Sequence, residues 1–322
     1  MNYKPFGDND FEVSETGFGA WGIGGVAQDC KSYGPTDDKV SVQALNEAYN
    51  AGVTFYDTSP IYGYGHSEDL IGKTFAKVRN KIIINTKVGY INYQGDQDFS
   101  PKYIRSSIES SLRRLRTDYV DILQLHDPPI QLLIKDDNII IELKKLKEEG
   151  KIRVIGISNS SQEEDIFAVR KFDFKSIQIN FNLIDQRALF NGLFDECAKY
   201  GVGVIGRTPL CFGFLTGKYS SKDKYPTSDH RSMWSLDQID RWANAVKLFA
   251  NNRSEQNKGT PTQMALRYCL SYPLISTTIP GMLTKEHVLE NTQASQFGAL
   301  PNRVLKKYNK IFHENTFFVS KR

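Results

Sequence analysis

The sequence predicts a (β/α)8 (TIM) barrel with a short N-terminal β-hairpin and extra helices. Two observations carry this prediction. Short apolar runs alternate with longer amphipathic segments, which is typical of a parallel sheet covered by helices. The alternation repeats about eight times in 322 residues, and a chain of that length suits one barrel domain spanning residues 1–322. An open, doubly wound parallel sheet is the alternative architecture with the same alternation.

Eight apolar runs are short enough to be the strands of the sheet. They are residues 17–21, 54–57, 82–88, 120–126, 152–158, 176–180, 202–206 and 274–279. The turn-forming segment GDND, residues 7–10, predicts a small hairpin before the first strand. No linker, low-complexity tract or internal repeat interrupts this pattern.

The segments between the strands carry helix signals. Ser100 and Pro101 are an N-cap and a first helical residue, and an apolar stripe with helical spacing follows them. Residues 260–263, TPTQ, form a capping box. Residues 38–50 and 137–149 are predicted as helices that end before a glycine, and an amphipathic helix is predicted after Pro301. The polar stretch 216–240 is expected to be a long functional loop.

Composition and charge exclude several classes of protein. Hydrophobic residues are 40% and charged residues 24% of the chain, which excludes general disorder. The net charge of +4 is too balanced to indicate nucleic acid as the main partner. Cys30, Cys197, Cys211 and Cys269 are far apart, so we expect free thiols and no metal site. Since no signal peptide and no apolar stretch of about 18 residues is found, we expect a cytoplasmic protein that does not span a membrane.

Polar residues that suit chemistry stand at three successive strand ends. Asp57 ends the second predicted strand, Lys87 lies near the end of the third, and His126 ends the fourth. Tyr62 follows in the loop after Asp57. The three strand residues share side-chain parity with Phe55, Ile83 and Ile122, respectively. Because a barrel carries its catalytic groups at the C-terminal strand ends, we expect all four side chains at one mouth.

Each of these four residues alone has an ordinary explanation. Asp57 suits a cap, Lys87 a solvated surface, His126 a loop hydrogen bond and Tyr62 a packed loop ring. Together they suit proton transfer through the phenol of Tyr62, whose ordinary pKa is about 10. A lysine about 4 Å away is expected to lower that pKa by two to three units. Asp57 then orients the lysine and His126 places a substrate oxygen, which makes a general-acid site for reducing a carbonyl.

The sequence resembles the aldo-keto reductase family. The matching segments are FYDTSPIYGYGHSE, NTKVG, LQLHDP, GKIRVIGISN, IQINFN, PLCFGFLTGKY and TIPG…ENTQA. They occur in the family's order along nearly the whole chain. The resemblance implies a (β/α)8 barrel and a reversible carbonyl–alcohol conversion with a nicotinamide cofactor. It assigns the catalytic tetrad to Asp57, Tyr62, Lys87 and His126, with Tyr62 as the proton donor.

The resemblance also implies where the cofactor binds. The carboxamide contacts are Ser158, Asn159 and Gln178, and the contacts at the nicotinamide end are Gly19, Ala20 and Asp57. The segment over the pyrophosphate supplies Arg207, Thr208, Pro209, Leu210, Gly213, Leu215 and Gly217, and the adenosine end supplies Ile279, Gly281, Lys285, His287, Glu290 and Asn291. The substrate pocket is assigned to Trp21, Tyr62 and His126. Taken separately, these residues also suit an N-cap, a glycine-rich turn, a solvated helix face and a core aromatic.

The sequence departs from the family pattern at three positions. Arg207 stands where many members stack an aromatic ring on the nicotinamide, although a guanidinium can also stack. Ala20 replaces a common threonine near the nicotinamide ribose. His287 aligns where NADPH-preferring relatives often have arginine, and Lys285 is on the same helical turn. We therefore expect NADPH in preference to NADH.

Other functions remain as alternatives. Gly17 to Gly22 fits the dinucleotide fingerprint G-x-G-x-x-G, but no helical pattern follows it. Asp57 and Asp127 could serve as a glycosidase pair, which leaves the tyrosine and lysine without a role. A regulatory module that resembles potassium-channel β subunits is the alternative without catalysis.

We expect a small-molecule carbonyl or sugar substrate, with aromatic pocket walls from loop residues such as Tyr33, Tyr225 and Trp234. The sequence is silent on the oligomeric state.

Overall fold

The fold is that of a computed structural model, which describes residues 1–26, 31–250 and 259–319. An antiparallel hairpin, β1 (Tyr3–Pro5) with β2 (Glu12–Ser14), precedes an eight-stranded sheet. The sheet consists, in sequence order, of β3 (Phe18–Gly19), β4 (Phe55–Asp57), β5 (Ile83–Val88), β6 (Val120–His126), β7 (Ile152–Ser158), β8 (Ser176–Asn180), β9 (Gly203–Arg207) and β10 (Ile275–Thr278). Every neighbouring pair in this sheet is parallel, and spatial order follows sequence order.

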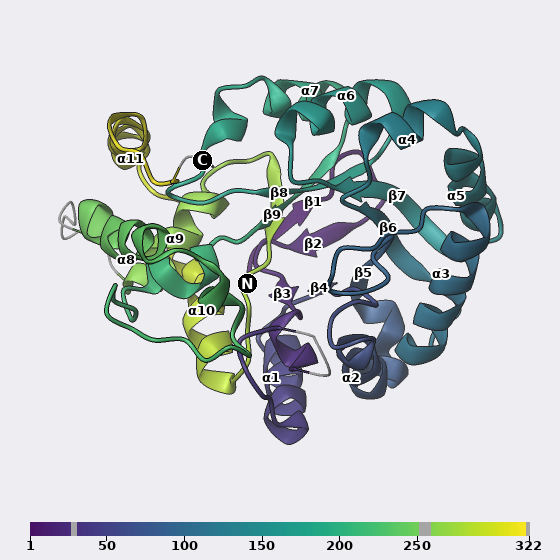
Figure 1. The fold of residues 1–322 in the computed structure, drawn as a ribbon, viewed down its shortest axis with the longest axis horizontal. Coiled ribbons are helices and arrows are strands. Elements are labelled where there is room, and N and C mark those ends of the chain that lie inside the picture. Colours follow the sequence, from purple (N-terminus) through teal and green to yellow (C-terminus); the bar gives the residue numbers. More distant parts are fainter. Residues whose placement is uncertain (27–30, 251–258, 320–322) are drawn as a thin grey trace.

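The sheet closes on itself. The Gly17 amide donates to the Thr278 carbonyl oxygen at 2.8 Å, and the Gly19 amide donates to the Pro280 carbonyl oxygen at 3.0 Å. Parallel bridges therefore join the first strand to the last. The strands form the centre of Figure 1, with helices around them. The barrel prediction is confirmed, and the open-sheet alternative is wrong because an open sheet has two unpaired edges.

The helices predicted after Ser100, Thr260 and Pro301 and over residues 38–50 and 137–149 are present, together with others that the sequence signals did not predict. They are α1 (Asp38–Asn50), α2 (His66–Phe75), α3 (Pro101–Leu115), α4 (Ile130–Lys135), α5 (Asn138–Glu148), α6 (Gln162–Phe172), α7 (Leu193–Lys199), α8 (Leu236–Ala250), α9 (Pro261–Leu270), α10 (Lys285–Phe297) and α11 (Asn302–Glu314). The Ser100 hydroxyl caps α3 by accepting from the Tyr103 amide, and Thr260 and Gln263 form the predicted capping box of α9. None of the described helices is long and apolar enough to cross a membrane.

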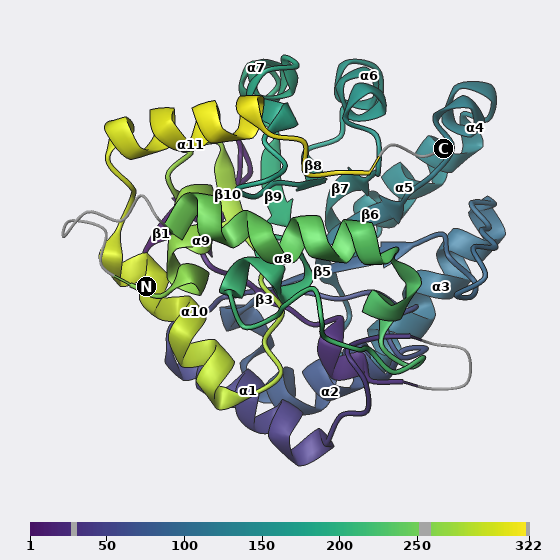
Figure 2. The ribbon, with the colours of Figure 1, turned by 60° about the vertical axis from the view of Figure 1, so that its left-hand side comes forward.

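The polar stretch 216–240 is not one long loop, which corrects the prediction. The 3₁₀ turn η4 (Cys211–Thr216) ends at its start, η5 (His230–Met233) lies inside it, and α8 begins at Leu236. The helix forms because Ile239, Trp242 and Val246 recur at helical spacing and are buried. Figure 2 shows α8 in the middle of the molecule, below α11 in that view.

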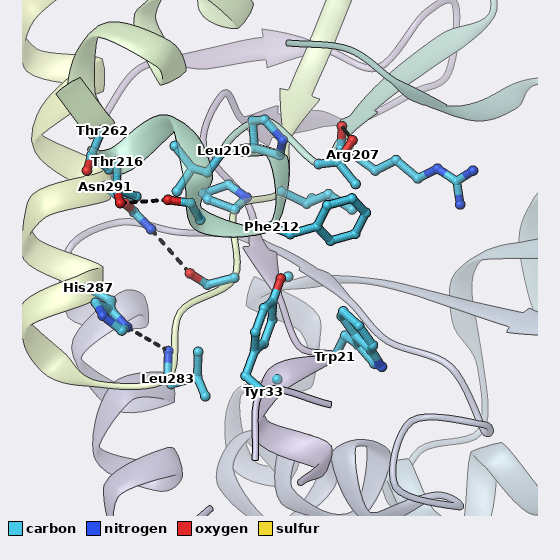
Figure 3. Close-up of a pocket in the computed structure, with 18 of the residues that line it drawn as sticks. Trp21, Tyr33, Arg207, Leu210, Phe212, Thr216, Thr262, Leu283, His287 and Asn291 are labelled. Carbon is cyan, nitrogen blue, oxygen red and sulfur yellow. Dashed lines mark hydrogen bonds between the residues drawn. The ribbon is translucent and has the colours of Figure 1, made fainter. Parts of the chain in front are cut away.

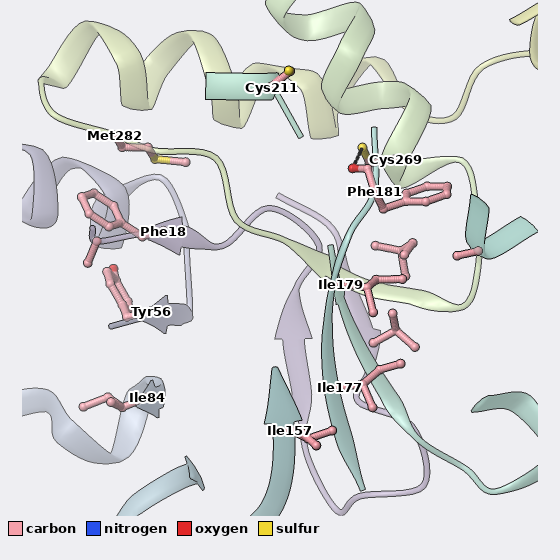
Figure 4. Close-up of a cluster of buried hydrophobic side chains, with 14 of the residues drawn as sticks. Phe18, Tyr56, Ile84, Ile157, Ile177, Ile179, Phe181, Cys211, Cys269 and Met282 are labelled. Atoms are coloured by element: carbon pink, nitrogen blue, oxygen red, sulfur yellow. Dashed lines mark hydrogen bonds between the residues drawn. The ribbon is translucent and has the colours of Figure 1, made fainter. Parts of the chain in front are cut away.

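Two apolar layers hold the barrel together. Inside it, Phe55, Ile122, Val154 and Ile205 pack against Phe6 of the N-terminal hairpin. Outside it, strand side chains of the opposite parity pack against the helices, among them Phe18, Tyr56, Ile84, Ile157 and Ile177 (Figure 4). The hairpin lies at the N-terminal strand ends, where the Asp8 amide donates to the Gly201 carbonyl oxygen just before β9. The C-terminal ends are thereby left for a site.

The cysteines in the described residues agree with the prediction of free thiols. Cys197, Cys211 and Cys269 are buried and unbonded to one another. Cys30 lies outside the described residues. Among the described residues, no group of histidine, cysteine and acidic side chains is arranged to hold a metal ion.

Candidate active site

A buried ion pair lies at the C-terminal ends of β4 and β5. Lys87 Nζ donates to both carboxylate oxygens of Asp57, at 2.8 and 2.9 Å, and also to the Thr58 carbonyl oxygen at 3.0 Å. Burial is the largest single effect and lowers the pKa of Lys87, but Asp57 and Tyr62 together outweigh it and raise that pKa above 10.5. Lys87 is therefore held as a cation, although its side chain is 1% exposed.

Tyr62 reaches this pair from the turn after β4. Its hydroxyl oxygen lies 3.1 Å from Lys87 Nζ. The turn passes close to the backbone of Gly24, and Gly63, with a φ of 61°, leaves no room there for a side chain. The predicted contact between lysine and phenol is present in the structure.

The expected direction of the Tyr62 pKa is wrong. Burial raises the pKa above its ordinary value of 10.0, Lys87 lowers it by less, and Asp57 adds to the rise. The sequence argument counted only the lysine, whereas desolvation of the phenolate is the larger effect. In this structure Tyr62 is a protonated phenol, the form that donates a proton.

His126 ends β6 beside the tyrosine. The ring centroids of Tyr62 and His126 are 6.4 Å apart and nearly perpendicular, and Tyr90 flanks the histidine on another side at 4.8 Å. Burial, followed by the positive charges of Lys87 and Arg207, lowers the pKa of His126 well below 6.5. The imidazole is therefore neutral near pH 7 and can donate one N–H to an oxygen placed beside Tyr62.

A cavity of about 570 Å³ runs from this group to α10 (Figure 3). Most of the residues predicted for cofactor and substrate line it. These are Gly19, Trp21, Asp57, Tyr62, Gln178, Arg207, Thr208, Pro209, Leu210, Gly213, Ile279, Gly281, His287, Glu290 and Asn291. The cavity is thus bounded by elements from both halves of the chain, and a volume of this size is typical of a small-molecule site.

Several predicted residues do not line the cavity. Lys87, His126, Ser158 and Asn159 are not among its lining residues. Ala20 is fully buried and donates its amide to the Asp57 carbonyl oxygen, and Leu215 packs in the core. Gly217 is the C-cap of η4. Lys285 extends to Glu47 on α1, with its Nζ 3.1 Å from the carboxylate.

The three residues predicted to bind the carboxamide differ in whether their side chains already have hydrogen-bond partners. Gln178 donates to Asp57 Oδ1 at 2.6 Å, and the Ser158 hydroxyl reaches Gln178 Oε1 at 3.4 Å. The Asn159 side chain is buried, and neither its nitrogen nor its oxygen has a hydrogen-bond partner. A buried amide without a partner costs about 1–3 kcal/mol, which a ligand with a donor and an acceptor would remove. Asn159 therefore fits the carboxamide of a nicotinamide.

The segment after β9 has an unusual backbone. Thr208, Cys211 and Phe212 have φ between 43° and 56°, and Gly213 has a φ of 96°. Left-handed residues so close together turn the chain sharply into η4. The Thr208 side chain is fixed by its hydroxyl, which donates to Asn180 Oδ1 at 3.0 Å. This turn forms one wall of the cavity.

The far end of the cavity is formed by the first turns of α10. His287 accepts a hydrogen bond from the Leu283 amide at 3.4 Å (Figure 3), and burial, followed by Lys218, lowers its pKa below 6.5. Glu290 accepts from the Thr260 hydroxyl at 2.7 Å and from Lys218 Nζ at 3.1 Å. Lys218 lines the cavity, and its Nζ is paired with the Glu290 carboxylate.

The aromatic wall is larger than the sequence indicated. Tyr33 lines the cavity as a predicted candidate, but Phe212, Tyr219 and Arg231 do so without having been predicted. Arg231 forms a bidentate ion pair with Asp229, with a shortest contact of 2.6 Å, and its guanidinium lies over the rings of Tyr33, Tyr219 and Tyr225. These residues have no regular spacing, so no sequence period could have revealed the cluster.

Comparison with known proteins agrees with the barrel fold. The model of the Aldo/keto reductase family matches residues 15–312. L-galactose dehydrogenase from Arabidopsis thaliana is 32% identical over 306 residues, which cover 91% of this chain and 88% of that protein. The NADH-specific methylglyoxal reductase of Escherichia coli (strain K12) is 28% identical over 319 residues, covering 91% of this chain and 93% of that protein.

A solved structure extends the similarity to three dimensions. The glycerol dehydrogenase AKR11B4 from Gluconobacter oxydans matches with a TM-score of 0.79 at 28% identity, covering 99% of this chain and 97% of that chain. The family match spans most of the residues that build the barrel, and the similar structure spans nearly all of them. The chain therefore belongs to the aldo/keto reductase family, a family of oxidoreductases.

Proposed function

We propose that the protein reduces an aldehyde, ketone or sugar carbonyl reversibly to the alcohol, with NADPH used in preference to NADH. The observation that carries the proposal is the buried Asp57–Lys87 pair, which holds the Tyr62 hydroxyl at the end of the cavity. Similar proteins named as an L-galactose dehydrogenase, a methylglyoxal reductase and a glycerol dehydrogenase support catalysis over the regulatory-module alternative.

The tetrad residues divide the proton chemistry among them. Tyr62 gives its proton to the carbonyl oxygen, and Lys87, 3.1 Å away, stabilises the phenolate that remains. Asp57 keeps Lys87 charged and in place. Neutral His126 donates a hydrogen bond to the same substrate oxygen and so orients it. In the direction of alcohol oxidation, the phenolate of Tyr62 takes the proton back.

The other cavity residues suit a nicotinamide dinucleotide. When bound, this cofactor supplies or accepts the hydride. Asn159, with its unpartnered amide, holds the carboxamide together with Gln178. The turn after β9 would hold the pyrophosphate. The preference for NADPH rests on Lys218 and His287 beside the start of α10, since Lys285 is turned to Glu47.

The experiment is the loss of reduced-nicotinamide absorbance with a panel of aldehydes, ketones and sugars. Tyr62→Phe keeps the ring but removes the proton, so we expect kcat to fall by about 10²- to 10⁴-fold while the cofactor still binds. Tyr103→Phe, which removes a hydroxyl from α3, is the matched control and is expected to retain activity. Unchanged turnover in the Tyr62 variant would contradict the mechanism. Running NADPH and NADH in parallel tests the preference, which equal kcat/KM values would refute.

A further inference from the structure

Arg207 is a guanidinium at the cavity wall with hydrogen-bonding capacity to spare. It is the last residue of β9, and one of its Nη atoms donates to the Asn159 carbonyl oxygen at 3.0 Å. Its Nε is buried and has no partner, and within the described residues it forms no ion pair. In Figure 3 its side chain extends away from Leu210 and Phe212. Several N–H donors of the guanidinium fork therefore remain for a ligand.

The acidic groups near Arg207 do not neutralise it. Asp165 on α6 is fully buried, with both carboxyl oxygens unpartnered. Burial raises its pKa well above 3.8, and Arg207 offsets this only in part. Neither of its oxygens forms a hydrogen bond or an ion pair with the Arg207 guanidinium. Asp127 uses its two oxygens for the Ser160 amide at 2.8 Å and the Tyr90 hydroxyl at 3.2 Å. Arg207 thus lines the cavity without an ion-pair partner among the described residues.

Arg207 and Tyr62 line the same cavity. The positive charge of Arg207 acts on both proton-handling residues, lowering the pKa of Tyr62 against the effect of burial and lowering that of His126 along with burial. The one other cavity-lining arginine, within the residues the structure describes, is Arg231, and it is already paired with Asp229. A substrate with its carbonyl oxygen at Tyr62 therefore meets one unpaired guanidinium, that of Arg207.

We propose that Arg207 selects carbonyl substrates that carry an oxyanion, a carboxylate or a phosphate, a few bonds from the carbonyl carbon. The inference rests on the proposed reductase function. Both anions offer oxygens in the geometry that a guanidinium fork binds in bidentate fashion. The carbonyl is reduced with hydride from the nicotinamide and the proton of Tyr62, and the anionic group is unchanged in the product.

The test compares anionic and neutral aldehydes of similar size. Succinic semialdehyde is paired with butanal, and glyceraldehyde 3-phosphate is paired with glyceraldehyde, so the two pairs distinguish carboxylate from phosphate. For at least one pair, we expect a kcat/KM for the anionic member that is about 10-fold or more above that of the neutral member. Arg207→Gln should lower this ratio by about 10- to 100-fold, and Arg207→Lys should restore part of it.

The ratio of the kcat/KM values for the anionic and the neutral aldehyde separates recognition of the anion from a general loss of activity. Any general effect of Arg207→Gln on cofactor binding or folding acts on both aldehydes of a pair and cancels. Arg231→Gln is the matched control, since it also removes a cavity-lining guanidinium, and its ratio should equal that of the wild type. A wild-type ratio near one for both pairs, or a ratio that survives in Arg207→Gln, overturns the inference.

A binding measurement keeps the two proposals distinct. Absence of turnover with all aldehydes contradicts the proposed function. Titration with succinate and with inorganic phosphate, followed by the fluorescence of Trp21 beside the cavity, then tests Arg207 without catalysis. Binding of either anion that weakens about 10-fold or more in Arg207→Gln, but not in Arg231→Gln, supports the anion site. Equal binding in both variants and the wild type overturns it.

Discussion

At the scale of residues, Tyr62 and His126 are both uncharged near neutral pH for the same reason. Burial raises the pKa of the phenol and lowers that of the imidazole, because in each case it disfavours the charged form. The neighbouring Lys87 acts with burial at His126 and against it at Tyr62. In the proposed mechanism, each residue therefore holds the proton that it needs before a carbonyl binds.

A pH dependence follows from these directions. Reduction needs a protonated Tyr62, so kcat/KM for reduction should be flat between about pH 6 and pH 8 and fall as the pH rises through a pKa above 10.0. Oxidation of the alcohol needs the phenolate, so its kcat/KM should rise over the same alkaline range. Profiles of both directions with one substrate pair check this. A loss of reduction with an apparent pKa near 7 would show that His126 titrates in the working range.

At the scale of elements, a buried carboxylate joins three neighbouring strands. Asp121 on β6 accepts hydrogen bonds from Arg79 before β5 at 2.7 Å, from Arg153 on β7 at 2.8 Å and from the Ile84 amide on β5 at 2.9 Å. Asp121 is 1% exposed, so its loss leaves arginines without their buried partner. These strands also carry Lys87 and His126, so their register positions the site.

We expect Asp121→Ala to lower the free energy of unfolding by about 3–5 kcal/mol, the usual result of removing one partner from a buried ion pair. Asp10→Ala is the control, because Asp10 also pairs with Arg153 but its side chain is 87% exposed. That variant should lose less than about 1 kcal/mol. Urea unfolding of both variants measures the difference, and similar losses would contradict a special role for Asp121.

At the scale of the whole molecule, the two ends of the barrel have separate tasks. Phe6 of the hairpin is fully buried and packs with Phe11 and Phe55 at ring distances of 5.4 and 6.1 Å. This end fills the barrel interior, while the other end carries the cavity. Stability and specificity can therefore change independently. That residues 1–322 act as one domain stays a prediction.

Phe6→Ala should separate the two tasks. We expect it to lower the free energy of unfolding by about 3–5 kcal/mol, because it leaves a cavity in the barrel interior. The KM values for cofactor and carbonyl should change by less than about twofold, because the site is at the opposite end of the strands. Denaturant unfolding and steady-state kinetics on the same preparation check both parts. A large change in KM with little loss of stability would refute this division.

The sequence by itself determined the alternation of strands and helices, several caps, and the placement of Asp57, Lys87 and His126 at strand ends. These features depend on local signals, namely side-chain periodicity, turn residues and strand-end motifs, which are complete within a few residues. The prediction of one long loop over 216–240 was wrong because polar residues surround the apolar positions at the start of α8. Arg231 and Phe212 were not predicted as cavity residues, because contacts with residues distant in sequence place them there.

Only the tertiary structure decided the closure of the barrel, the direction in which the pKa of Tyr62 shifts and the absence of an ion pair at Arg207 among the described residues. Closure needs hydrogen bonds between the first strand and the last, which are about 260 residues apart. Burial of Tyr62 and the lack of an ion pair at Arg207 among the described residues depend on groups from several strands and helices at once. Desolvation and charge act through space, so residues that are far apart in the sequence set them together.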